Sequence, residues 1–95
     1  MPKSSNGSAW GLEITPRAEK ELRNLGSADQ VRVRKFLRTR IEGATDPRRD
    51  GKPLGGVLSG FWRYRVGDIR VLCRLEGHRV VVVVVTIAHR REVYR

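Results

Sequence analysis

Two runs of β-forming residues, separated by only two turn residues, restrict the fold of this chain more than any other feature of its sequence. The runs cover residues 61–66 and 69–75, and Gly67-Asp68 lies between them. A two-residue connection with glycine in the first position is typical of a type II′ turn, which joins neighbouring antiparallel strands. The sequence therefore predicts a tight β-hairpin, and the turn fixes which residues face each other across it.

This register sorts the hairpin residues onto two chemically different faces. The apolar face, which we expect to pack against helices, carries Trp62, Tyr64, Val66, Ile69, Val71 and Cys73. The other face carries Arg63, Arg65, Arg70 and Arg74, with Arg65 directly opposite Arg70. Opposed like charges cost about 0.2–1 kcal/mol, so the arrangement favours an anion between the guanidinium groups, whose planar donors match phosphate. The alternatives are a solvated face, or arginines paired with acids such as Asp50 or Glu92.

Two further strands are predicted far apart in the sequence. Trp10, Leu12 and Ile14 alternate with Gly11 and Glu13, which is the pattern of a short strand with one buried face. The valine-rich run at 80–87 follows a turn at residues 76–78 and is typical of a strand buried on both faces. We expect this last strand in the middle of the sheet.

Two helices are predicted between the first strand and the hairpin. Thr15 is a suitable N-cap and Pro16 a suitable first helical residue, and an apolar stripe follows at Ala18, Leu22 and Leu25. Gly26 is expected to end this helix in a left-handed conformation, with Ser27 and Gln30 forming a capping box for the next helix. The second helix is expected to end near residue 43 and to bury Val33, Phe36, Leu37 and Ile41.

These elements predict an α+β fold of order β-α-α-β-β-β, in which an N-terminal strand and a helical hairpin pack on an antiparallel sheet. Residues 46–60 are rich in glycine and proline and are expected to form a loop. Residues 1–8 are expected to be a flexible tail, and residues 9–95 a single domain, because 95 residues have room for only one hydrophobic core.

The chain carries 20 Lys and Arg against 10 Asp and Glu, a net charge of +10. This balance favours a polyanionic partner, with nucleic acid first, although charge alone leaves an acidic protein or an anionic membrane possible. No signal peptide and no apolar run near the ~20 residues of a membrane helix is present, so we expect a soluble, cytoplasmic protein without membrane contact. One cysteine, Cys73, cannot form an intramolecular disulfide. No second ligand lies at usable spacing from His89, so neither a metal nor another cofactor is expected.

The segment after the last strand adds further cations, an imidazole and a phenol, in the order His89-Arg90-Arg91-Glu92-Val93-Tyr94-Arg95. A tyrosine beside arginines is able to stack on a base of single-stranded RNA, and the alternative is a residue that packs on the sheet edge. Phosphate-binding glycine loops and a nucleophile elbow are absent from the sequence.

Four stretches together resemble the RelE branch of the RelE/ParE toxin superfamily: Asp46-Pro47-Arg48, Gly51-Lys52-Pro53-Leu54, the hairpin at 62–70 and the ending at 87–94. The resemblance implies a toxin of a type II toxin–antitoxin system, a metal-independent endoribonuclease that cuts messenger RNA at the ribosome and is silenced by an acidic antitoxin. It also implies catalytic roles for Arg63, Arg65, Arg70, Arg90 and Tyr94. Lys52, Arg74 and Arg91 are expected to add RNA contacts.

The sequence departs from RelE at two positions, where lysines of that family are replaced by Arg63 and Arg65. Arginine stays protonated in proteins and is a poor general base. The base is therefore His89 or Lys52, or most of the rate comes from electrostatic stabilisation of the phosphate, which is the account that we favour. Two other functions stay open: a ParE-like toxin that inhibits a protein such as DNA gyrase, and a plain nucleic-acid-binding module.

Overall fold

The hairpin predicted around Gly67-Asp68 is present in the computed structural model, which describes residues 9–89 of the chain. Strands β3 (Phe61–Val66) and β4 (Ile69–Glu76) pair antiparallel, with Arg65 opposite Arg70. Gly67 has a φ of +61°, whereas Asp68 does not have a positive φ. Glycine therefore occupies the one left-handed position of a type II′ turn, and the predicted register of the arginines is confirmed.

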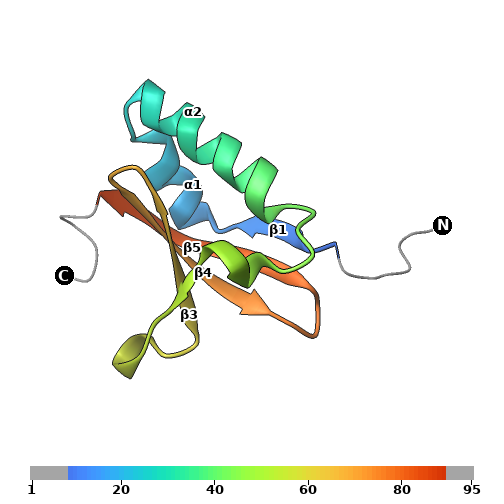
Figure 1. Cartoon of the computed structure of the whole chain (residues 1–95). Helices are drawn as coiled ribbons and strands as arrows, with labels where there is room; N and C mark the ends of the chain where they lie inside the picture. Colours follow the sequence, from blue (N-terminus) through green and yellow to red (C-terminus); the bar gives the residue numbers. More distant parts are fainter. Residues whose placement is uncertain (1–8, 90–95) are drawn as a thin grey trace.

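The hairpin belongs to a five-stranded sheet of order β1-β5-β4-β3-β2 (Figure 1). Strand β1 (Gly11–Ile14) runs parallel to β5 (Val81–His89), and every other pair of neighbours is antiparallel. The sheet is thus mixed and not fully antiparallel, because the chain between β1 and β5 is long enough for the crossover that a parallel pair needs. The predicted loop at 46–60 also contributes a two-residue edge strand, β2 (Lys52–Pro53), which pairs with β3.

The first helix begins as the sequence predicts, and the second has an unexpected end. In α1 (Pro16–Arg23), Thr15 Oγ1 accepts a hydrogen bond from Ala18 N, and Pro16 is the first helical residue. Helix α2 (Ser27–Phe36) continues into one π-helical turn at Leu37–Ile41, in which Glu42 N donates to Leu37 O over 2.8 Å. This turn keeps Leu37 and Ile41 buried on the same side.

The predicted cap between the helices is wrong. Gly26 has a φ of −60° and is the N-cap of α2, so it is not a left-handed residue. Gln30 does not complete a capping box, because its Nε2 donates to the carbonyl oxygens of Arg23 and Leu25 at 3.1 and 2.8 Å. The amide of Gln30 thus satisfies carbonyl groups at the end of α1. In helices that end with a left-handed glycine, backbone N–H groups satisfy these carbonyls instead.

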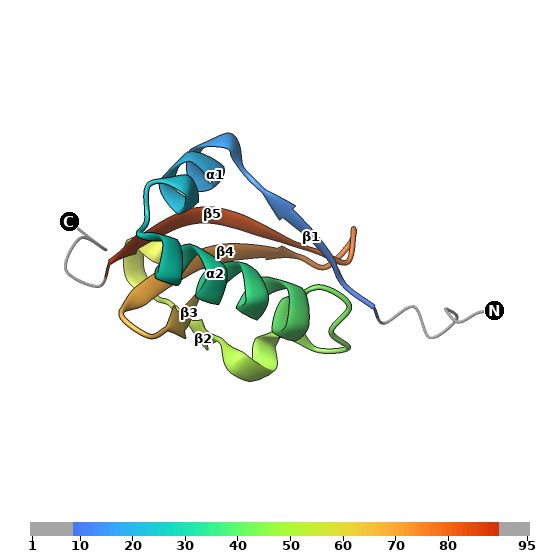
Figure 2. The same ribbon diagram turned by 90° about the horizontal axis from the view of Figure 1, so that it is seen from above.

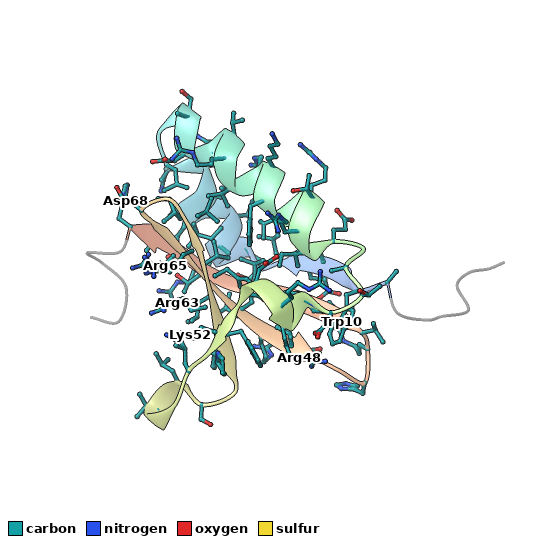
Figure 3. The ribbon with its side chains drawn as sticks, viewed as in Figure 1. Trp10, Arg48, Lys52, Arg63, Arg65 and Asp68 are labelled. Carbon is teal, nitrogen blue, oxygen red and sulfur yellow. The ribbon has the colours of Figure 1, made fainter. Side chains whose placement is uncertain are left out.

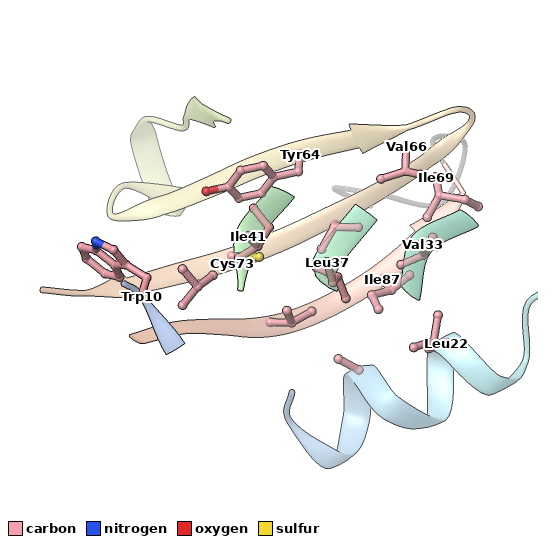
Figure 4. Close-up of a cluster of buried hydrophobic side chains, with 14 residues drawn as sticks. Trp10, Leu22, Val33, Leu37, Ile41, Tyr64, Val66, Ile69, Cys73 and Ile87 are labelled. Atoms are coloured by element: carbon pink, nitrogen blue, oxygen red, sulfur yellow. The ribbon is translucent and has the colours of Figure 1, made fainter. Parts of the chain in front are cut away.

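Helix α2 and its π-helical turn cover the apolar face of the sheet, while α1 lies beside β5 (Figure 2). Figure 4 shows the core between these layers, to which the helices contribute Ala18, Leu22, Val33, Leu37 and Ile41 and the hairpin contributes Tyr64, Val66, Ile69, Val71 and Cys73. Phe36 is only partly buried and packs against Tyr64, with ring centroids 5.9 Å apart. The apolar face predicted for the hairpin is confirmed, with Trp62 partly buried at its margin.

Helix α1 protects the half of β5 that β1 does not reach. Strand β1 pairs with β5 only as far as Ile14 opposite Val84. Beyond that point Glu21 Oε1 accepts hydrogen bonds from Thr86 Oγ1 at 2.7 Å and from Ile87 N at 2.8 Å. Burial raises the pKa of Glu21, but these hydrogen bonds and Arg17 outweigh burial and hold it below its ordinary value. A carboxylate therefore satisfies a strand edge that would otherwise offer a free donor.

Candidate functional site

The face of the sheet that the helices leave uncovered carries two rows of cations. Lys52 of β2 is opposite Arg63 of β3, and Arg65 of β3 is opposite Arg70 of β4. Directly opposed residues in antiparallel strands project from the same face of the sheet. Figure 3 shows Lys52, Arg63 and Arg65 along one side of the molecule, away from α2. We refer to Lys52, Arg63, Arg65 and Arg70 as the basic cluster.

Three members of this cluster have no acidic partner within residues 9–89. Asp50 pairs with Arg40 at 3.4 Å, and Glu92 lies outside the described residues. Lys52, Arg63 and Arg65 form no ion pair with any residue of that range. The Nε of Arg63 is moreover buried and has no hydrogen-bond partner in that range. Because a buried donor left without an acceptor costs free energy, this atom indicates an acceptor that residues 9–89 do not supply.

A buried tyrosine supports the segment that leads into β2, where Lys52 lies opposite Arg63. Tyr64 Oη donates a 2.8 Å hydrogen bond to Pro47 O, in the short 3-10 helix Pro47–Asp50 that leads into β2. Burial raises the pKa of Tyr64 well above its ordinary value, so the hydroxyl keeps its proton and remains a donor. Gly51 passes so close to this ring that an added Cβ would lie 2.7 Å from Tyr64 Cε2. The sequence placed Tyr64 in the core but did not reveal that this residue supports the segment before Lys52. The only sign of that support in the sequence is Gly51, which directly precedes Lys52.

Arg74 lies on the same face as the cluster but belongs to a different environment. Its Nη2 lies 3.0 Å from Glu76 Oε2, so the positive charge predicted for RNA contact is paired within the chain. Glu76 also binds Arg79, which reaches Glu13 of β1 at 3.1 Å. The structure thus separates Arg74 from the basic cluster, although the sequence grouped the four hairpin arginines together.

His89 is not brought together with the basic cluster. Leu72 is opposite Thr86, but Cys73 is opposite Val84, so Val85 is an extra residue in β5. This bulge reverses the alternation of side chains along the strand. His89 is opposite the buried Ile69 and lines a hollow with residues of α1, on the helix side of the sheet.

Three of the predicted site residues, Arg90, Arg91 and Tyr94, lie outside the described residues. In the part of the chain that is described, no three His, Cys, Asp or Glu side chains come together in a way that would hold a metal ion. None of the helices there is long and apolar enough to cross a membrane. The arrangement that remains is a cationic surface able to bind a phosphate through several donors at once.

A family model described as the ParE toxin of the type II toxin–antitoxin system parDE matches residues 12–94 of the chain. The chain belongs to the RelE/ParE toxin superfamily. Toxin RelG of Mycobacterium tuberculosis is 38% identical over 50 residues, which are 53% of this chain and 58% of that toxin. The match therefore spans little more than half the length of this curated relative.

Solved structures of the superfamily have the same fold. The toxin–antitoxin complex RelBE2 of Mycobacterium tuberculosis matches with a TM-score of 0.79 and 27% identity, covering 88% of this chain and 94% of that one. A mutant of the Escherichia coli toxin RelE in complex with a peptide of antitoxin RelB matches with a TM-score of 0.67 and 29% identity, covering 90% of each chain. The resemblance drawn from the sequence is confirmed, since the chain belongs to a family of type II toxins.

Proposed function

We propose that this toxin is a metal-independent endoribonuclease that cleaves messenger RNA at the ribosome in the cytoplasm, with the scissile phosphate bound by the basic cluster. The observation that carries the proposal is the buried Nε of Arg63, which has no hydrogen-bond partner within residues 9–89. Arg63 is the cross-strand neighbour of Lys52, and Arg65, two residues further along β3, is the cross-strand neighbour of Arg70. These cations match the negative charge that accumulates on a phosphate under nucleophilic attack.

In the proposed reaction the ribose 2′-oxygen attacks the neighbouring phosphorus, and the bond from phosphorus to the 5′-oxygen breaks. The products are a 2′,3′-cyclic phosphate and a 5′-hydroxyl. Water takes the proton of the 2′-hydroxyl and supplies one to the 5′-oxygen, while the guanidinium groups stabilise the charge on the phosphoryl oxygens. Arginines stay protonated, so Lys52 is the member of the basic cluster able to exchange a proton. Arg90, Arg91 and Tyr94 complete the proposed set.

An RNA digest in EDTA tests this proposal directly. A parallel digest of messenger RNA on ribosomes contains Mg²⁺, because ribosomes dissociate without it. In whichever digest the purified toxin cuts, the products should be a 2′,3′-cyclic phosphate or 3′-phosphate and a 5′-hydroxyl. Products with 5′-phosphates would rule out the mechanism. No cleavage of free RNA or of messenger RNA on ribosomes would rule out the ribonuclease proposal as a whole.

The second candidate is a toxin that inhibits a protein target, such as DNA gyrase, without cleaving RNA. The family model that matches residues 12–94 is that of ParE, which favours this reading. The two candidates separate in one pair of assays, because a ParE-like toxin should inhibit gyrase supercoiling and leave RNA intact.

Both candidates share a proposed partner, an acidic antitoxin that covers the basic and apolar surfaces. The net charge of +10 supports this partner, and the solved relatives include toxin–antitoxin complexes. Expression of this chain alone should slow bacterial growth, and co-expression of the cognate antitoxin should restore it. Harmless expression at high level in a sensitive host would contradict a toxic role.

A further inference from the structure

A hollow of about 350 Å³ lies where β5 ends beside the turn between α1 and α2. Its walls include Asn24 and Gly26 from the turn and Ala88 and His89 from the strand. The proposed cleavage chemistry does not use it. Its polar side chains and its position next to the basic cluster indicate what kind of ligand it is able to bind.

The walls of this hollow are held by hydrogen bonds within the chain. Gln30 Nε2 bridges the carbonyl oxygens of Arg23 and Leu25, which fixes the turn between the helices. The two oxygens of Glu21 accept bonds from Thr86, Ile87 and Arg17, which ties the helix to the strand. The hollow is therefore built into the fold, and the Glu21 carboxylate is already occupied.

Two polar side chains in the walls form no such hydrogen bonds within residues 9–89. Neither the amide of Asn24 nor the imidazole of His89 has a hydrogen-bond partner within residues 9–89. An amide offers a donor and an acceptor side by side, which is the pattern that pairs with the edge of a base. An imidazole offers a flat face on which a base stacks.

The hollow adjoins the phosphate-binding surface. Ala88, in its wall, is the cross-strand neighbour of Arg70, which in turn faces Arg65. Neighbouring strands are ~4.7–4.9 Å apart, so one wall of the hollow lies a single strand from the basic cluster. A base is joined to its own phosphate through one ribose, and a nucleotide is thus able to reach from the cluster to the hollow around the end of β5.

We propose that this hollow binds a nucleobase of the RNA whose phosphate lies on the basic cluster. In this arrangement Asn24 reads the base edge, and His89 stacks on the ring. The inference rests on the proposed function and extends it, because a base held here gives the toxin a sequence preference that phosphate contacts alone do not supply.

Titration of the isotope-labelled toxin with small probes, followed by amide chemical shifts, tests this proposal without any need for cleavage. Inorganic phosphate and ribose 5-phosphate should shift the amides of Arg65 and Arg70 and leave Leu25, Gly26 and Ala88 unmoved. The four nucleoside 5′-monophosphates should shift both groups, and one of them should bind more tightly than the others. Nucleotides that shift only the hairpin amides would overturn the nucleobase site and leave the phosphate site standing. Phosphate that shifts nothing on the hairpin would count against the proposed function itself.

Two glycines offer a matched pair of blocking variants. An added Cβ at Gly26 or at Gly77 meets no heavy atom within 4 Å, and neither glycine has a positive φ. Gly26→Leu fills the hollow and should abolish the nucleotide shifts at Leu25 and Ala88 while the phosphate shifts persist. Gly77→Leu, in the β4–β5 turn, should change neither.

A smaller variant covers the case in which Gly26→Leu unfolds. Asn24→Ala removes an exposed side chain and should weaken nucleotide binding without weakening phosphate binding. It should also reduce the differences in affinity among the four nucleoside 5′-monophosphates. Unchanged nucleotide affinity and preference in Asn24→Ala would overturn the assignment of this residue to the base edge.

Discussion

The two ends of the uncovered sheet face differ in how their cations are paired. Near the β4–β5 turn, Glu76 accepts from Arg74 and Arg79, and Arg79 also reaches Glu13. Near the β3–β4 turn, Lys52, Arg63 and Arg65 form no ion pair within residues 9–89. Both ends carry cations on the same sheet, and the difference lies in whether a carboxylate of residues 9–89 pairs with those three side chains.

The paired end shows what these arginines do when the chain itself supplies the anion. Hydrogen bonds from Arg79 and then Arg74 hold the pKa of Glu76 below its ordinary value. Glu13 and then Glu76 raise the pKa of Arg79. Lys52, Arg63 and Arg65 have no such anion within residues 9–89, which supports the proposal that a phosphate binds at this end of the face.

Arg65→Leu is expected to give the largest effect and would break the comparison most clearly. It removes one of two opposed cations, so the free protein should be as stable as the parent or more stable by up to about 1 kcal/mol. RNA cleavage should fall by roughly 10²-fold or more, because a charged donor to the phosphate is lost. Urea unfolding midpoints and cleavage rates measure the two quantities.

Arg74→Leu is the matched control for Arg65→Leu, because it removes an exposed arginine of the same face that is already paired. It should leave the cleavage rate close to that of the parent. If Arg65→Leu instead unfolds more easily and Arg74→Leu loses the activity, the roles assigned to the two ends are reversed.

Gly51→Ala sharpens the comparison by disturbing only the support of Lys52. The added methyl group would lie 2.7 Å from the Tyr64 ring, so the loop must shift. Overpacking of this kind costs about 1–3 kcal/mol, and the displaced Lys52 should lower the cleavage rate as well. Gly55→Ala, whose added methyl group meets nothing within 4 Å, is the control for the urea midpoint. If the urea midpoints of Gly51→Ala and Gly55→Ala are equal, the loop around Gly51 accommodates the methyl group without loss of stability, and the close packing on Tyr64 does not constrain it.

Glu21→Gln tests a carboxylate that joins α1 to β5 through hydrogen bonds and that lies away from the basic cluster. The pKa of Glu21 is lower in the folded protein than its ordinary value near 4.5, so its contribution to stability is complete above that value and is lost as the pH falls through the folded pKa. Loss of a charge-assisted hydrogen bond should cost about 1–3 kcal/mol at pH 7. Urea midpoints between pH 3 and pH 7 should rise less in Glu21→Gln than in the parent. Glu42→Gln should follow the parent, since Glu42 forms no ion pair within the described range.

Arg79→Gln is expected to give the smallest effect. Its ion pairs with Glu13 and Glu76 are exposed to solvent, and such pairs contribute little to stability. The urea midpoint should move only slightly, more at low salt than at high salt, and RNA cleavage should stay at the parental rate. A large loss of cleavage would show that the paired end also takes part in binding RNA.

The sequence predicted those parts of the fold that depend on local geometry. Two residues, Gly67 and Asp68, were sufficient to fix the arginine register, because a two-residue turn permits few alternatives. The N-cap at Thr15 followed from chemistry within a few residues of the chain. Gly26 was misjudged because the long side chain of Gln30 performs the capping from a distance.

The rest depends on contacts between residues far apart in the sequence. The parallel pairing of β1 with β5 and the pairing of Lys52 with Arg63 leave no local trace. The bulge at Val85 lies within a run of valines that reads the same in either register, and it decides on which face of the sheet His89 lies. The three arginines of the basic cluster were therefore predicted from the hairpin, whereas the placement of Lys52 and His89 was not.

The parallel pairing of β1 with β5 also sets the order of events during synthesis. Thr15 Oγ1 donates to Val85 O across 70 positions of sequence, and contacts of such separation form late because the intervening chain must first be closed into a loop. At a ribosomal rate of about 5–20 residues per second, β1 waits for its neighbour until almost all of residues 9–89 have been made. Strand β4 likewise lacks one of its two neighbours until β5 emerges. The nascent chain thus passes most of its synthesis without a finished sheet on which the basic cluster is held.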